Sequence, residues 1–173
     1  MINKKMSDSL NAHMNLELFS AHLYLVMSSC ANELGLKGTA NWFFVQYREE
    51  MAHFMKFYAY LADQGVVISI PAGKAVPNKY KSLLDMVQKT LAHEQLITSC
   101  INDLSEQAVK EKDHATQIFL QWFVTEQIEE ENNDRDLIAK LKLVGDNGYG
   151  ILMIDAEMGQ RAFVAPAGSP LAV

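Results

Sequence analysis

The 173-residue sequence contains little cysteine, proline or glycine, with two, four and nine residues respectively. Cys30 and Cys100 form no C-x-x-C pair, which excludes a disulfide framework and a zinc finger, so we expect both to be small core residues. No apolar run is long enough to cross a bilayer, and the first ten residues lack the apolar stretch of a secretory signal. We therefore expect a cytoplasmic protein without a membrane partner.

Basic residues are also scarce, because 15 lysines and arginines face 21 acidic residues and give a net charge of -6. A nucleic-acid surface needs clustered positive charge to neutralise phosphates, so we expect no nucleic-acid partner. The acidic excess suits cations better.

The scarcity of glycine and proline leaves long segments of strong helix formers. We predict helices over about 6–33, 39–64, 82–109 and 113–144, a turn over 145–150 and a short fifth helix over 151–158. Residues 66–79 contain Pro71 and Pro77 and predict an extended crossover between the second and third helices. The predicted fold class is all-α: a four-helix bundle of two hairpins joined by that crossover. We assign residues 1–158 to one domain and expect poor order in a tail over 159–173.

Each long helix has an apolar stripe at three-to-four-residue spacing, and on each helix a carboxylate interrupts it. The four interruptions are Glu17, Glu50, Glu94 and Glu130. Four buried carboxylates cost several kcal/mol each unless something compensates their charge. Two divalent cations would neutralise them, with His53 adding a nitrogen ligand, so the pattern predicts a two-metal site.

The ligand types also indicate which metal binds. Oxygen-rich ligation with one imidazole favours a hard or borderline redox metal such as iron, and carboxylates stabilise Fe(III) over Fe(II). Glu50 and His53 form the Glu-x-x-His element of di-iron bundles, whereas the fourth helix has Gln127-x-x-Glu130 in place of a second such element. We expect the second metal, which lacks a histidine, to be held more weakly.

Four segments of the sequence are MNLELFSAHLY, REEMAHF, HEQLIT and QWFVTEQIEEE, which begin at residues 14, 48, 93 and 121. Through these segments, in this order and spacing, the sequence resembles bacterial non-haem ferritins over nearly its whole length. It implies a ferritin-like bundle that stores iron, oxidises Fe(II) with O2 at a di-iron ferroxidase centre and deposits Fe(III) oxyhydroxide inside a hollow homo-oligomeric shell of twenty-four subunits.

The resemblance also assigns roles to individual residues. It implies that Glu17, Glu50 and His53 bind the first iron, that Glu50 bridges to a second iron held by Glu94 and Glu130, and that Gln127 lies beside the second iron. A third iron position would use Glu49, Glu126 and Glu129, with Glu130 shared. Tyr24 and Trp122 match aromatic residues that could donate electrons during O2 reduction.

Several alternatives remain open from the residues alone. Glu49, Glu126 and Glu129 could form a solvated acidic helix face. Met51 stands where bacterioferritins present a methionine to haem, but packing or an unused surface methionine explains it better and we expect no haem. We treat His13, His22, His93 and His114 as ordinary surface or edge histidines and keep Asp134 outside the site. Rival functions are a bacterioferritin, a di-iron oxygenase and a non-catalytic shell subunit.

Overall fold

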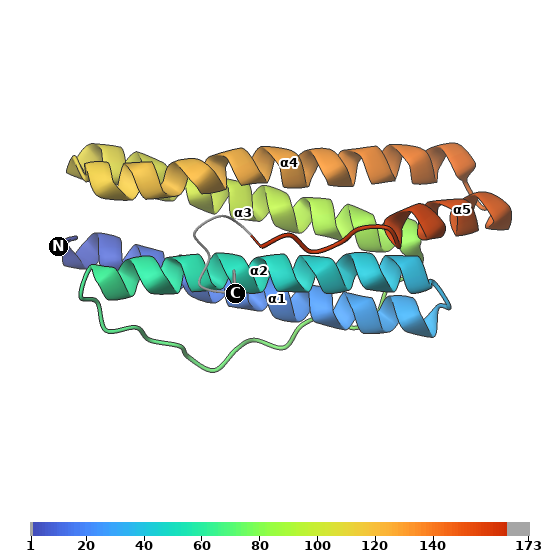
Figure 1. Cartoon of the computed structure of the whole chain (residues 1–173), viewed down its shortest axis with the longest axis horizontal. Helices are drawn as coiled ribbons and strands as arrows, with labels where there is room; N and C mark the ends of the chain where they lie inside the picture. The colour runs from blue at the N-terminus through green and yellow to red at the C-terminus, as the bar shows by residue number, and fades with distance from the viewer. Residues whose placement is uncertain (1, 166–173) are drawn as a thin grey trace. The chain divides into compact units, whose positions relative to one another are not determined.

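The computed structural model describes residues 2–165, in which all regular secondary structure is helical (Figure 1). The helices are α1 (Lys4–Glu33), α2 (Lys37–Asp63), α3 (Leu83–Glu111), α4 (His114–Val144) and α5 (Gly148–Met158). The four long helices confirm the predicted ones to within two residues at each end. The predicted turn over 145–150 is wrong in part, because the Asn147 side chain accepts a hydrogen bond from Gly150 N at 3.0 Å and starts α5 at Gly148.

Local sequence signals explain where the long helices stop and start. Gly35 and Gly65 adopt φ values of +78° and +74°, the left-handed conformation that ends helices and that glycine adopts without strain. Ser82 and Asp113 accept hydrogen bonds from Asp85 N and Thr116 N, each at 3.1 Å, and so cap the N-termini of α3 and α4. The turn before Asp113 passes through Lys112, which has a positive φ of 55°.

The chain divides into two compact units. Among the described residues, the first contains 10–80 and 146–165, and therefore most of α1, all of α2, the crossover and α5. The second contains residues 2–9 and 81–145, and therefore α3 and α4. None of the helices within residues 2–165 has the length and hydrophobicity needed to span a membrane.

In the first unit, α1 and α2 pack against each other through polar and aromatic contacts. Ser28 Oγ donates to the Ala40 carbonyl at 2.7 Å, and the rings of Tyr24 and Phe43 stack with centroids 6.1 Å apart. The crossover is tied to α1, because Asn11 exchanges two hydrogen bonds of 2.9 Å with the Ser69 backbone. These contacts hold α2 and the crossover against α1.

The N-terminus of α2 is capped from α5. The Asp155 carboxylate accepts hydrogen bonds from Gly38 N at 3.0 Å and Thr39 N at 2.7 Å, which satisfies free amides and places a negative charge at the positive end of the helix. A Cβ at Gly38 would lie 1.6 Å from the Asp155 carbonyl oxygen, so only glycine allows this approach.

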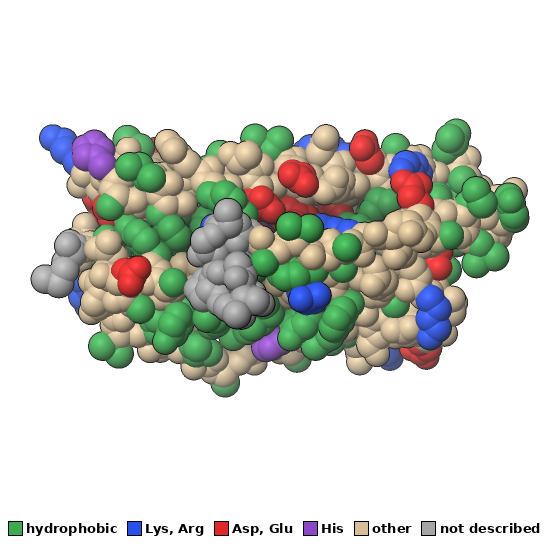
Figure 2. Space-filling model, viewed as in Figure 1, with side chains coloured by type: hydrophobic (Ala, Val, Ile, Leu, Met, Phe, Trp, Pro, Cys, Tyr) green, Lys and Arg blue, Asp and Glu red, His purple; other side chains and the backbone are tan. Residues whose placement is uncertain are grey.

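Residues 159–165, the start of the predicted tail, lie along α2. Asn41 Nδ2 donates to the carbonyls of Gly159 and Arg161 at 3.3 and 2.9 Å, and the Arg48 guanidinium lies 4.1 Å from the Phe163 ring centroid. The expectation of poor order over residues 166–173 falls outside the described residues. Figure 2 shows apolar side chains gathered over α2, where Phe44, Tyr47, Arg48, Met51 and Phe163 line a groove of about 540 Å³.

In the second unit, α3 and α4 pack along each other through apolar side chains. The buried residues include Val87, Ile97 and Ile101 of α3 and Leu120, Phe123 and Leu137 of α4. Ser9 Oγ donates to Gln107 Oε1 at 3.0 Å and ties the beginning of α1 to α3. Cys30 in the first unit and Cys100 in the second are each half-buried, so the expectation that both are core residues is wrong.

Candidate metal site

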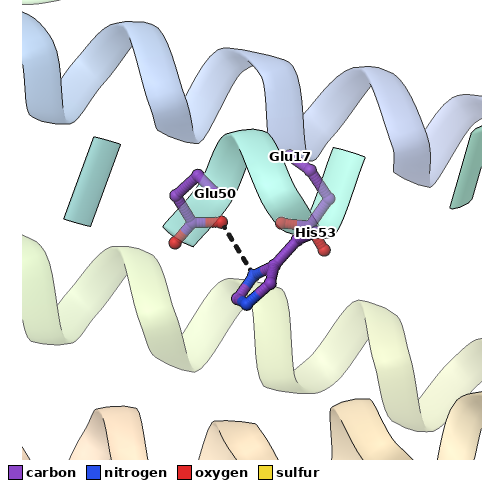
Figure 3. Close-up of side chains that lie close together, drawn as sticks. All are labelled: Glu17, Glu50 and His53. Atoms are coloured by element: carbon purple, nitrogen blue, oxygen red, sulfur yellow. Dashed lines mark hydrogen bonds and ion pairs between the residues drawn. The ribbon is translucent and has the colours of Figure 1, made fainter. Parts of the chain in front are cut away.

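Three candidate ligands, two carboxylates and one imidazole, converge in the first unit (Figure 3). Glu17 comes from α1, and Glu50 and His53 lie three residues apart on one face of α2. Each offers a ligand atom, and these atoms all lie within 4.8 Å of one another. The three side chains are buried, with exposed fractions of 1%, 2% and 2%. The structure thus brings together the three residues that the sequence assigned to the first metal.

Each carboxylate of this cluster contacts a histidine. Glu50 Oε2 lies 3.2 Å from His53 Nδ1, and Glu17 Oε1 lies 2.8 Å from His13 Nε2. Burial by itself raises the pKa of the Glu17 carboxyl. The charge and hydrogen bond of His13, the charge of His53 and a smaller contribution from Glu50 together outweigh burial and lower that pKa from 4.5 to about 2. Glu17 is therefore held as a carboxylate, the form that binds metal ions.

His13 corrects the sequence interpretation, which treated it as a surface or edge histidine. It is only 5% exposed, and its ring contacts Phe57 of α2 with centroids 4.9 Å apart. The sequence carried one usable signal, since His13 stands four residues before Glu17 and so faces it on a helix. His22 and His114 are exposed, as expected, and His93 is half-buried.

Glu94, Gln127 and Glu130 lie buried in the second unit. The Gln127 amide Nε2 donates to the Glu94 carboxylate at 3.0 Å and to the Glu94 carbonyl at 3.2 Å, which joins α4 to α3. A fixed donor on a buried carboxylate lowers the cost of its charge. This contact gives Gln127 a physical role that the sequence pattern alone did not provide.

Two further acids in the second unit are buried although the sequence analysis gave them no role. Glu131 accepts a hydrogen bond from Thr98 Oγ1 at 2.7 Å and forms an ion pair with Arg135. The spacing of Glu131 and Arg135, four residues apart on a helix, was the signal that could have identified this pair. Asp134 is also buried, and we have no account of it.

The three acids assigned by resemblance to a third iron differ in their surroundings. Glu49 is half-buried and accepts a hydrogen bond of 2.8 Å from Arg161, whose guanidinium also lies 4.7 Å from the Trp42 ring centroid. Glu126 is half-buried and Glu129 is exposed. Of the two candidate electron donors, Tyr24 is fully buried, whereas Trp122 is half-buried and packs edge-on against Phe123 at 4.8 Å.

Comparisons with known proteins identify the family. Residues 7–144 match the family model named Ferritin, which is described as a ferritin-like domain. The chain is 40% identical over 159 residues to the probable bacterial non-heme ferritin-like protein of Haemophilus influenzae, covering 92% of this chain and 96% of that one. It is 39% identical over 155 residues to the bacterial non-heme ferritin of Campylobacter jejuni, covering 90% and 93%. The chain belongs to the ferritin family.

Solved structures agree with this assignment. An engineered closed form of the Archaeoglobus fulgidus ferritin matches this ferritin with a TM-score of 0.93 at 39% identity, covering 95% of this chain and 100% of that one. The open pore ferritin from the same archaeon matches with a TM-score of 0.92, covering 94% and 100%. The predicted fold class, a ferritin-like four-helix bundle with a short fifth helix, is confirmed, and the chain is an iron-storage ferritin subunit.

Proposed function

We propose that this ferritin subunit is a ferroxidase that binds Fe(II) at Glu17, Glu50 and His53 and oxidises it with O2. The observation that carries the proposal is the convergence of two buried carboxylates and one imidazole within 4.8 Å. Two buried negative charges are costly side by side, and a divalent cation compensates them while the imidazole completes an iron-type donor set. Because carboxylates stabilise Fe(III) relative to Fe(II), binding at this site favours oxidation of the iron ion.

A second iron follows from the family pattern. By that pattern, Glu94 and Glu130 would supply its carboxylates, Glu50 would be shared between the two ions and Gln127 would stand beside the second one. Two Fe(II) ions then provide the two electrons that reduce one O2, with two protons, to hydrogen peroxide. Tyr24 is a candidate one-electron donor in the same reduction, in place of one of the two electrons from iron, because it is fully buried and stacks on Phe43.

The proposal also includes a third iron position, which would use Glu49, Glu126, Glu129 and the shared Glu130. Glu49 is engaged by Arg161, so an iron ion there competes with a guanidinium. Storage completes the proposed function: Fe(III) leaves the oxidation centre and is deposited as oxyhydroxide mineral inside a homo-oligomeric shell, which by family resemblance contains twenty-four subunits.

The direct test is the rate of aerobic Fe(II) oxidation, followed by stopped-flow absorbance in the assembled protein. We expect His53→Ala and Glu94→Ala each to slow the initial rate by at least about 10–100-fold, because losing a ligand should cost no less than losing a partner that supports one. The matched control is Glu33→Ala, which removes an exposed carboxylate from α1.

Circular dichroism and size-exclusion chromatography should show that all three variants remain folded and assembled. If the His53→Ala and Glu94→Ala variants oxidise Fe(II) as fast as the unmutated protein, the ferroxidase assignment is wrong.

A further inference from the structure

His13 is a buried polar group that contacts the metal cluster and that the proposed function does not use. It lies one helical turn before Glu17 on α1, and its side chain is almost completely buried. The Nε2 atom lies 2.8 Å from Glu17 Oε1, and the ring packs against Phe57 of α2 at an interplanar angle of 52°. The imidazole is therefore fixed between a neighbouring helix and a candidate metal ligand.

The chemistry of the contact determines its direction. An ionised carboxylate can only accept hydrogen bonds, so the proton must be on Nε2 and the imidazole donates it to Glu17 Oε1. A nitrogen that carries this proton has no lone pair to offer a metal ion. Nε2 of His13 therefore cannot bind the metal, and His13 does not belong to the group of converging ligand atoms, so the structure connects it to the metal through Glu17.

The two oxygens of Glu17 consequently differ. Oε1 is held by His13, whereas Oε2 is buried and accepts no hydrogen bond from the residues that the structure describes. A buried carboxylate oxygen without a donor is costly, and a metal ion can replace the missing donor. The arrangement leaves one oxygen of Glu17 anchored and the other available for coordination.

We propose that His13 is a positioning residue, which anchors Glu17 through Oε1 and so orients Oε2 to coordinate Fe(II) together with Glu50 and His53. This inference rests on the proposed function, because it needs a metal ion at the cluster. Hydrogen-bond partners of metal ligands typically contribute 10–100-fold to metal affinity, by fixing the ligand orientation before the metal arrives.

The test uses anaerobic Co(II) titration of the full-length assembled protein, with the visible d–d spectrum reporting the coordination geometry. His13→Leu keeps an apolar side chain against Phe57 but removes the donor, whereas His13→Gln keeps an amide donor within reach of Glu17. The control is His22→Ala, an exposed histidine on the same helix.

We expect His13→Leu to weaken Co(II) binding by about 10–100-fold and to alter the d–d bands. His13→Gln should restore most of the affinity and the spectrum, and the His22→Ala variant should match the unmutated protein. Unchanged Co(II) affinity and spectrum in His13→Leu would overturn the inference, as would equal loss in the Leu and Gln variants, which would assign the effect to ring packing.

Two outcomes separate this inference from the proposed function. If the unmutated protein binds Co(II) and His53→Ala abolishes binding, but His13→Leu has no effect, only the role of His13 is wrong. If the unmutated protein does not bind Co(II), the metal site and the inference fail together.

Discussion

The two units of this ferritin both bury carboxylates, but they compensate the charge by different means. In the first unit, Glu17 and Glu50 face histidines, His13 at 2.8 Å and His53 at 3.2 Å. In the second unit, Glu94 is held by the neutral amide of Gln127, and Glu131 is paired with a permanent cation, Arg135. A neutral histidine can donate a nitrogen lone pair to a metal, whereas a guanidinium has none to offer.

This difference indicates which buried acids are stabilised by the fold alone and which are arranged to bind a metal ion. The fixed partners of Glu94 and Glu131 stabilise these two acids of the second unit whether or not a metal is bound. The cluster of the first unit is stabilised by partners that also suit a metal ion. Each prediction below tests one side of this comparison, in order of decreasing effect.

The largest effect concerns pH, because the pKa of Glu17 lies at about 2 in the folded protein, below its ordinary value of 4.5. A lowered pKa stabilises the folded state above pH 4.5, and that stability is lost as the pH falls towards 2. We expect the metal-free protein to lose roughly 3 kcal/mol of unfolding free energy over this range from Glu17 alone. Urea unfolding at pH 5 and at pH 3, after the metal has been removed with a chelator, measures the part of this loss in unfolding free energy that occurs above pH 3.

Two variants make this pH test specific. Glu17→Gln should flatten the pH dependence of the unfolding free energy. Asp85→Asn should change it little, although hydrogen bonds from Lys89 and from the Lys81 backbone also lower the pKa of Asp85, because Asp85 lies near solvent at the start of α3. A Glu17→Gln variant with unchanged pH dependence would refute the role given to the His13 and Glu17 pair.

The next effect is stabilisation by metal. A ligand that binds only the folded state at 100 times its Kd adds about 2.7 kcal/mol of stability. We expect Zn(II) to raise the Tm of the unmutated protein and to have little effect on a Glu17→Gln, His53→Ala double variant of the first unit. Differential scanning calorimetry with and without Zn(II) provides the measurement.

A matched variant in the second unit sharpens the calorimetric result. Glu131→Gln removes a buried acid that already has Thr98 and Arg135 as partners, so Zn(II) should still raise its Tm. If Glu131→Gln lost the Zn(II)-dependent rise in Tm as fully as the double variant of the first unit, the distinction between the two units would be wrong.

The smallest effect concerns Gln127. Replacing it by Leu removes the donor from the buried Glu94 carboxylate, so we expect a loss of about 1–3 kcal/mol in unfolding free energy without metal. Gln121→Leu, at an exposed position on α4, is the control. Equilibrium urea unfolding compares the two, and equal stability would mean that the amide contact is not needed to hold Glu94.

The sequence predicted most of the fold because helix boundaries depend on local chemistry. Gly35, Gly65, Ser82 and Asp113 mark helix ends through backbone conformation and capping, which neighbouring residues determine. Asn147 also caps a helix, but it lies among three glycines and an aspartate that resemble a turn, so the start of α5 was placed too late.

The cluster of Glu17, Glu50 and His53 was predictable for a related reason. An acid that interrupts the apolar stripe of a helix lies on the face that packs into the core. His13 was not identified, because its burial depends on Phe57 of another helix. The contacts of residues 159–165 were also not predictable. Asp155, Asn41 and Arg161 meet partners 112 or more residues away along the chain, and no local pattern encodes such pairs.

The central claim is that a metal ion binds at Glu17, Glu50 and His53, and anomalous X-ray diffraction from crystals soaked anaerobically in Zn(II) tests it most directly. The account predicts an anomalous peak about 2.0–2.2 Å from a carboxylate oxygen of Glu17, an oxygen of Glu50 and a ring nitrogen of His53. Crystals that show zinc only at surface acids, with these three side chains uncoordinated, would contradict it.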